Sequence, residues 1–426
     1  MELSQVDKVS ENLKILVRTK LWAQLLVAAL LGVLSALVLK GSGRFLPPWV
    51  IQSITDWAGV PGGIFLALIQ MVVLPLIVSS IVISLSGISK QGSAKNLGII
   101  SIIVVLVTTL IAAFLGLGIT SLLNPGSLLG LTKTELAPVL SPSFVFTPED
   151  LIRLIPENPA ESILKGNMLQ VLILSIIGGL ALGEMGGAQK QSLTGFLESI
   201  QALSLRIIAF SMRIAPVAIF GTMLHSVAIA GFSVLSAMGA YLLCSFVGLT
   251  ALLLVYALMV KFVVGQSPIQ FFRKIREVQL LAFSLSSSAA TMPSTLQVAK
   301  QSLGISDEIA DFLIPLGTTI NMAGSAIWQS TATLFIAQGF GIHLPLPSLL
   351  MIVVITVGAS IGTPGVPGAG MGVLAATFSA VGIPAHGITY LLGVDRIVDM
   401  GCTVLNVTGD LVLCLIAQTL DRRQKK

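Results

Sequence analysis

The stretch Asp399-Met-Gly-Cys-Thr-Val-Leu-Asn-Val-Thr-Gly-Asp410 gathers two carboxylates, an amide, two hydroxyls and a thiol near the C-terminus. Apolar sequence continues on both sides of this stretch, which predicts that it lies at bilayer depth inside a membrane-spanning helix. An ionisable side chain at that depth is costly unless a partner stabilises its charge. A bound cation or a substrate ammonium would be such a partner, so the stretch predicts a binding site.

The composition indicates a polytopic membrane protein. The chain has 426 residues, of which 54% are hydrophobic and 10% are charged, and its mean hydropathy is +0.96. A soluble domain carries roughly 25% charged residues. The net charge of +5 comes from basic residues in short loops and tails, so it does not indicate a nucleic-acid partner. Three cysteines in apolar runs and three scattered histidines predict neither a disulfide nor a zinc or haem site.

The first two thirds of the chain predict membrane-spanning helices after a polar N-terminal segment, residues 1–20. By length and apolarity these helices are expected at about 21–41, 57–87, 97–123, 160–184, 195–226 and 232–264. Basic residues mark the two termini and the connections 88–96 and 265–278, whereas the connection 124–160 is acidic. The positive-inside rule therefore predicts cytoplasmic N- and C-termini and a multi-pass protein of a cell inner membrane.

The last third of the chain contains two broken apolar segments. Serines, a threonine and a proline interrupt residues 279–300, and IGTPGVPGAG interrupts residues 347–381. Each segment predicts two half-helices that meet at a non-helical tip, which a membrane tolerates only inside protein or beside a cavity. A long helix with a polar interruption follows each one, at Thr318–Ser325 and at Asn406–Asp410. Paired interruptions of this kind point to the binding site of a transporter.

The polar groups of these segments suit a hard cation such as Na⁺, which prefers oxygen ligands. Asp410 offers a carboxylate, and unwinding of the helix at Gly317–Asn321 and around Asn406 is expected to free backbone carbonyls. A second group of oxygen ligands is expected from the side chain of Thr319 and the carbonyls of Ser360, Ile361 and Thr363.

An organic substrate is predicted to bind beside the cation. The tip Ser286–Ser288 suits a carboxylate, because the start of a half-helix offers free N–H groups and a favourable dipole. Asn406 adds an amide, and Asp399 suits an ammonium, so these groups together describe a site for an α-amino acid. Cys402 lies three residues after Asp399 and is expected to face the substrate side chain. A thiol cannot pair with an acidic side chain, which favours a small neutral amino acid.

Four motifs resemble the dicarboxylate/amino acid:cation symporter family, and they occur in the family's order. They are SSSAATMP at 286–293, PLGTTINMAGS at 315–325, ASIGTPGVPGAG at 359–370 and DMGCTVLNVTGD at 399–410. The resemblance implies an all-α fold with eight transmembrane helices, two re-entrant helical hairpins and inverted repeats. It also implies a homotrimer that works by an elevator mechanism, with the second hairpin as gate.

The resemblance divides the chain into two parts. Residues 21–264 would form a trimerisation scaffold and part of the transport domain, and residues 265–426 would form the transport core. Within the core it implies hairpin 1 at about 268–303, a seventh helix at about 306–338, hairpin 2 at about 345–381 and an eighth helix at about 386–420.

The resemblance also assigns site residues. For the substrate it implies Ser287, Ser288, Ser325, Val366, Gly370, Asp399, Cys402, Thr403 and Asn406. For one Na⁺ ion it implies Gly317, Asn321, Asn406 and Asp410, and for a second Thr319, Ser360, Ile361 and Thr363.

Two positions depart from the family pattern. Members that carry acidic substrates have an arginine where Cys402 stands, and an arginine there would bind a side-chain carboxylate in a bidentate manner. With Cys402 at this position, the chain resembles the neutral amino acid branch of the family, the alanine-serine-cysteine type. Many members have an aspartate where Ala323 stands, as a ligand of a third Na⁺ site with Thr108, Thr109 and Asn321. Without that charge the third site is predicted to be weak or absent.

The sequence therefore predicts sodium-coupled transport of small neutral amino acids such as alanine, serine, threonine or cysteine. The alternatives are an acidic amino acid or dicarboxylate as substrate, and a proton as coupling ion. An acidic substrate would need a cation near Cys402, and Arg396, six positions away, is expected on a different face of the helix. A serine hydrolase is not expected, because no intramembrane histidine is spaced to act as base. A channel would need a ring of filter residues instead of an ammonium receptor.

Overall fold

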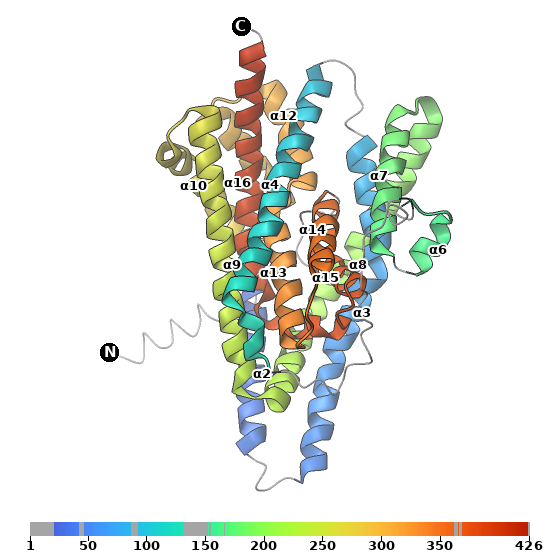
Figure 1. The fold of residues 1–426 in the computed structure, drawn as a ribbon, viewed down its shortest axis with the longest axis vertical. Coiled ribbons are helices and arrows are strands. Elements are labelled where there is room, and N and C mark those ends of the chain that lie inside the picture. The colour runs from blue at the N-terminus through green and yellow to red at the C-terminus, as the bar shows by residue number, and fades with distance from the viewer. Residues whose placement is uncertain are drawn as a thin grey trace.

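The computed structural model describes residues 21–41, 47–86, 93–130, 152, 155–165, 167–361, 365 and 369–424. These residues form a bundle of helices and contain no strand (Figure 1). Six helices in this part of the chain are long and apolar enough to cross a membrane, which fits the predicted polytopic membrane protein. The polar segment 1–20 and most of the acidic connection 124–160 lie outside the described residues.

Four helices pack on one another and form the first group in the bundle. They are α2 (Leu21–Gly41), α3 (Pro48–Ser86), α7 (Met168–Glu184) and α8 (Gly187–Ala230). Large apolar side chains such as Leu34, Val38, Trp57 and Phe210 are exposed on these helices. An apolar exterior is what a helix needs where lipid replaces water as the solvent.

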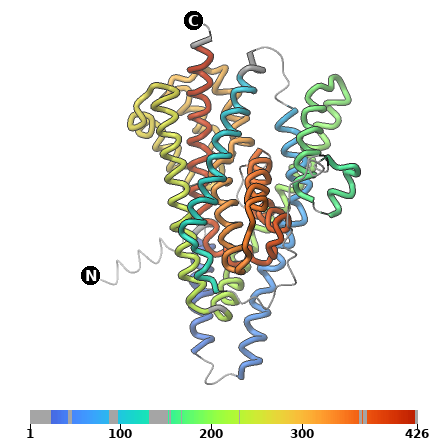
Figure 2. The backbone as a smooth tube through the Cα atoms, viewed as in Figure 1, coloured from blue at the N-terminus to red at the C-terminus, as the bar shows by residue number. Residues whose placement is uncertain are grey.

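The second group surrounds the C-terminal helix α16 (Leu392–Gln424). Its other long helices are α4 (Ser93–Leu123), α9 (Phe232–Met259) and α13 (Ala323–Gly339), and all of them contact α16. In Figure 2 the red tube of α16 runs close to the teal α4 and the yellow-green α9. In the most apolar stretch of α16, 94% of the residues are buried, whereas in that of α2 only 28% are buried. Helix α16 is therefore a core helix and α2 a peripheral one.

Short helices complete the second group. The first broken segment forms α10 (Pro268–Leu285), α11 (Ser288–Gln297) and the π-helix η5 (Val298–Ser302), and the second forms α14 (Leu346–Ser360) and α15 (Ala369–Ala380). Between them lies α12 (Asp307–Ile320). The remaining short elements are η2 (Pro125–Leu128), α6 (Pro159–Leu164), η4 (Val260–Val264) and η6 (Ala385–Tyr390).

Two predictions about helix continuity were wrong. The helix predicted over 160–184 is divided into α6 and α7, because the side chains of Asn158 and Asn167 each cap a separate helix start. The predicted unwinding around Asn406 does not occur, since α16 is continuous from Leu392 to Gln424. A neighbouring chain segment hydrogen-bonds the polar side chains of α16, so its backbone need not open to satisfy them.

Candidate functional site

The chain between α12 and α13 leaves the helical path at Asn321 and Met322 and docks against α16. Asn321 Nδ2 donates to Asp410 Oδ1 at 2.9 Å and lies 3.4 Å from the carbonyl oxygen of Asn406. In return, the backbone N–H of Gly324 donates to Asn406 Oδ1 at 2.8 Å. The predicted interruption is therefore present, but it is confined to Asn321 and Met322, and Gly317 remains within α12.

These contacts bring together the four residues predicted for the first cation site. Asp410 is 1% exposed, and its carboxylate lies beside Gly317 of α12. A Cβ atom on Gly317 would lie 2.5 Å from Asp410 Oδ1, so only glycine leaves room there. A buried carboxylate surrounded by neutral oxygen-bearing groups can hold a hard monovalent cation.

Tyr256 of α9 was not predicted to lie at this site. A Cβ atom on Gly409 would be 2.5 Å from the Tyr256 hydroxyl and 2.7 Å from Asn321 Nδ2, which places the phenol beside the amide of Asn321. The hydroxyl is buried and has no hydrogen-bond partner among the described residues. No sequence pattern indicated this position, because a tyrosine in an apolar helix is usually a packing residue.

The residues predicted for the other two cation sites are placed as follows. The hydroxyls of Thr319 and Ser360 each donate at 2.8 Å to carbonyls of their own helices. Ile361 follows α14, and Thr363 lies outside the described residues. On α4, Thr108 donates to carbonyls of its own helix, whereas the Thr109 hydroxyl is buried with no partner in the described part of the chain. The Ala323 methyl group is fully buried.

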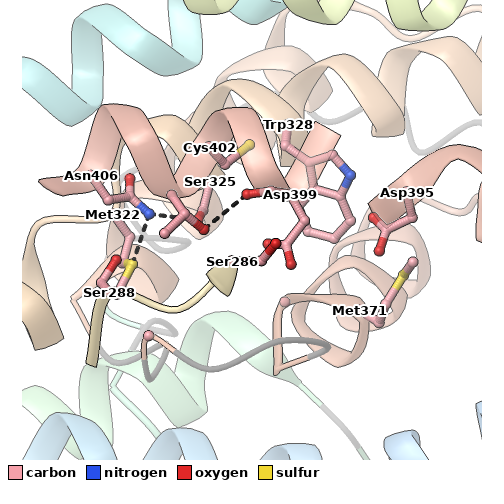
Figure 3. A pocket seen from close by; sticks show the side chains of 13 residues that line it. Ser286, Ser288, Met322, Ser325, Trp328, Met371, Asp395, Asp399, Cys402 and Asn406 are labelled. Carbon is pink, nitrogen blue, oxygen red and sulfur yellow. Dashed lines mark hydrogen bonds between the residues drawn. The ribbon is translucent and has the colours of Figure 1, made fainter. Parts of the chain in front are cut away.

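A small cavity lies next to the first cation site, on the face of α16 that carries Asp399 (Figure 3). Seven of the nine residues predicted to bind substrate line it, namely Ser288, Ser325, Gly370, Asp399, Cys402, Thr403 and Asn406. Ser286, which belongs to the tip predicted to bind a carboxylate, also lines it. The other lining residues were not predicted as substrate ligands, namely Met322, Trp328, Gly365, Met371 and Asp395. Its described lining thus contains two carboxylates and no basic side chain.

The tips of the two broken segments touch each other at the edge of this cavity. Ser287 Oγ donates to the carbonyl oxygen of Gly365 at 2.8 Å and accepts from the backbone N–H of Ala290, which caps α11. The N–H of Ala289 lies 3.3 Å from the same Gly365 oxygen. Ser287 therefore joins the two tips instead of lining the cavity, and Val366 lies outside the described residues.

Asp395 and Arg396 are functional candidates that the sequence analysis missed or dismissed. Asp395 lines the cavity, and the indole of Trp328 is directed toward it (Figure 3). Arg396 does not line this cavity, in agreement with its predicted place on a different face from Cys402, but its Nη1 donates to Asp399 Oδ2 at 3.1 Å. The signal was available, because residues three apart on a helix are neighbours, and Arg396 is three residues before Asp399.

The fold and the cavity define a class: a polytopic membrane protein whose buried acidic and polar groups lie beside broken helices, the arrangement typical of transporters. The chain belongs to the sodium:dicarboxylate symporter family, which matches residues 21–420. It is therefore a membrane transporter and not an enzyme.

Three relatives illustrate the functions found among similar proteins. The chain is 32% identical to the proton/glutamate-aspartate symporter of Escherichia coli over 92% of its own length and 91% of that protein. It is 29% identical to the proton/sodium-glutamate symport protein of Bacillus subtilis, over 92% of this chain and 91% of the relative. It is 28% identical to the C4-dicarboxylate transport protein of Bacillus subtilis, over 93% and 92% of the two chains. These names favour the acidic alternative over the predicted neutral substrate, and the neutral branch is not confirmed.

Proposed function

We propose that this protein couples the entry of Na⁺ to the transport of a small neutral amino acid. The observation that carries the proposal is the lining of the cavity, where Asp395, Asp399 and Cys402 are present and no basic side chain is found among the described residues. Asp399 would bind the ammonium group of the substrate. Ser288, Thr403 and Asn406 would bind its carboxylate through hydroxyl and amide donors. An additional carboxylate on the substrate side chain would meet Asp395 without a positive partner.

An acidic amino acid or dicarboxylate is the second candidate substrate. The names of the three relatives favour it, because each names glutamate, aspartate or a C4-dicarboxylate as the substrate. Arg396 is the cationic side chain that would serve such a substrate, because its guanidinium lies 3.1 Å from Asp399. To do so it would have to leave Asp399 and turn into the cavity.

Coupling is proposed to run through the first cation site. With Na⁺ bound, Asp410 would contribute a negative charge there, and Gly317, Asn321 and Asn406 lie beside it, which supports one Na⁺ ion. The second proposed Na⁺ site uses Thr319, Ser360, Ile361 and Thr363. A third site is weakened, because Ala323 leaves only the neutral groups of Thr108, Thr109 and Asn321 there. A proton is the alternative coupling ion, since two relatives are named as proton symporters.

We further propose a homotrimer that works as an elevator, with cytoplasmic termini and the second broken segment as gate. The division of the bundle into two packed groups supports a fixed scaffold of α2, α3, α7 and α8 and a moving part built around α16. In this proposal α4 and α9, which pack against α13 and α16, are the part of residues 21–264 that belongs to the transport domain. The contact of the two tips at Gly365 supports a gate at the edge of the cavity.

Uptake into proteoliposomes tests the proposal. Labelled serine, alanine, aspartate and succinate would each be supplied with an inward Na⁺ gradient, with an inward proton gradient, or with neither. Accumulation of serine or alanine that requires Na⁺, and that aspartate does not inhibit, is the expected result. Accumulation of aspartate or succinate in place of serine would establish the second candidate. If no solute accumulates under any gradient, both candidates are rejected.

A further inference from the structure

Arg396 occupies a position between the substrate cavity and the peripheral helices. Its side chain is 10% exposed, and it borders a second, smaller cavity on the side of α16 that faces α2, α3 and α8. Apart from Asp395 and Arg396, that cavity is lined by apolar side chains such as Leu25, Phe65 and Met212. A guanidinium does not lose its proton in proteins, so a fixed positive charge stands in apolar surroundings.

The neighbours of this charge are two carboxylates. Arg396 Nη1 binds Asp399 through one oxygen only, Oδ2, and Arg396 Nε is buried with no hydrogen-bond partner in the described part of the chain. Asp395, one residue away in the sequence, interacts electrostatically with both Arg396 and Asp399. Two acidic groups thus face one basic group, and with both carboxylates ionised the cluster lacks one positive charge. The ammonium group of an amino acid supplies one.

We propose that Arg396 is the resident counter-ion of Asp395 and Asp399, and that it allows the transporter to move without a substrate. This inference rests on the proposed function, because it assumes that Asp399 binds an ammonium group. The guanidinium and the ammonium bind the same carboxylate from different sides, so Arg396 is a positioning residue and does not contact the substrate.

The consequence concerns net uptake and exchange. Net uptake requires the empty binding site to return across the membrane after the amino acid has left. With Arg396 in place, the cluster of Asp395, Arg396 and Asp399 then lacks one positive charge. Without Arg396 it would lack two, in a region where an unpaired charge is strongly unfavourable. Exchange of one amino acid for another never passes through that state, because an ammonium is bound in both directions. Loss of Arg396 should therefore slow net uptake and spare exchange.

The experiment compares the two modes in the same proteoliposomes, using whichever amino acid the wild-type protein accumulates. Net uptake is measured into empty vesicles, and exchange is measured into vesicles loaded with the same unlabelled amino acid. For Arg396→Gln we expect net uptake to fall about tenfold or more, with exchange within about threefold of the wild type. Arg396→Lys should restore much of the net uptake, because it restores the charge. Arg213→Gln, the same change at an exposed position of α8, should alter neither mode.

A second variant separates charge from packing. Asp395→Asn combined with Arg396→Gln removes one negative and one positive charge, so net uptake should recover relative to Arg396→Gln alone. Gel filtration in detergent reports whether each variant is folded, and Arg396→Met, which also removes the charge, replaces Arg396→Gln if the latter aggregates. Equal loss of both modes, or no recovery in the double variant, would overturn the proposal. If the wild-type protein transports no amino acid at all, the proposed function fails first and this inference fails with it.

Discussion

Asp399 and Asp410 lie eleven residues apart on the same helix and have opposite surroundings. Asp410 is 1% exposed, and its described partner is the neutral amide of Asn321, at 2.9 Å. The side chain of Asp399 is 31% exposed and is paired with the guanidinium of Arg396. A buried carboxylate without a cationic side chain needs a cation from solution, whereas one that already has an internal cation can bind and release a second one. The difference supports a coupling role for Asp410 and a substrate role for Asp399.

The largest effect should come from Asp410→Asn. The substitution removes the charge that holds the proposed cation, and gradient-driven uptake should fall by about 100-fold or more. Uptake into proteoliposomes and the stabilisation of the purified protein by added Na⁺ would both measure this loss. Asp311→Asn is the control, because Asp311 is an exposed carboxylate paired with Lys300. Retained Na⁺-dependent uptake in Asp410→Asn would contradict the assignment of Asp410 to coupling.

A smaller but still large effect, on substrate preference, is expected from Cys402→Arg in the cavity that Asp399 lines. A guanidinium at this position would lie in the same cavity as Asp395 and would offer a bidentate partner for a second substrate carboxylate. The ratio of aspartate to serine uptake should rise by about tenfold or more, the size of a charge-assisted hydrogen-bond pair. Cys402→Ala, which keeps the position small and neutral, should leave that ratio near the wild-type value. An unchanged ratio in Cys402→Arg would mean that residue 402 does not face the substrate side chain.

A moderate effect is expected from Gly317→Ala at the cation side. The new methyl group would lie 2.5 Å from Asp410 Oδ1, so the carboxylate would have to shift away from the ion. The Na⁺ concentration for half-maximal uptake should rise severalfold, by about 1 kcal/mol of binding free energy or more. Gly118→Ala, in a helix where the added methyl group meets nothing within 4 Å, provides the matched control. Equal Na⁺ dependence in the two variants would argue against an ion beside Gly317.

The smallest effect is expected from Glu161→Gln, which neutralises a third carboxylate outside the membrane-spanning helices. Glu161 pairs with Lys165 at 2.6 Å on the exposed surface, and the hydrogen bond from Lys165 lowers the pKa of Glu161. Exposed pairs of this kind contribute little to stability. Uptake should therefore stay within about twofold of the wild type, as measured in the same vesicles. A large loss would show that an acidic residue far from Asp399 and Asp410 also takes part in transport.

Much of the helical architecture could be predicted from apolar length. The two broken segments and the interruption before α13 were predicted because serine, glycine and proline are concentrated there, and the structure contains all three. The continuity of α16 could not be predicted in this way. Asn406 and Asp410 read as a helix break, yet their side chains are satisfied by Gly324 and Asn321, residues more than eighty positions earlier in the chain.

The residues of the cavity were also predicted only in part from the sequence. Asp399 and Cys402 were predicted to share a face, since a spacing of three residues follows the helical repeat, and both line the cavity. Ser287 was assigned to the substrate from its place in a half-helix tip, but it contacts Gly365 of the other tip instead. Trp328 and Tyr256 were not predicted, because an aromatic residue in an apolar helix gives no sign of which polar group it will meet.

The amino-acid sequence by itself determined that the chain spans a membrane, that its last third carries broken helices, and that carboxylates within an apolar helix need partners. Those conclusions depend on local composition and on the high cost of burying charge in lipid. Only the tertiary structure decided which partners they have, with Arg396 beside Asp399 and Asn321 beside Asp410. The reason is that hydrogen bonds and ion pairs depend on distances of a few ångströms between side chains, and folding sets those distances between segments that are remote in sequence.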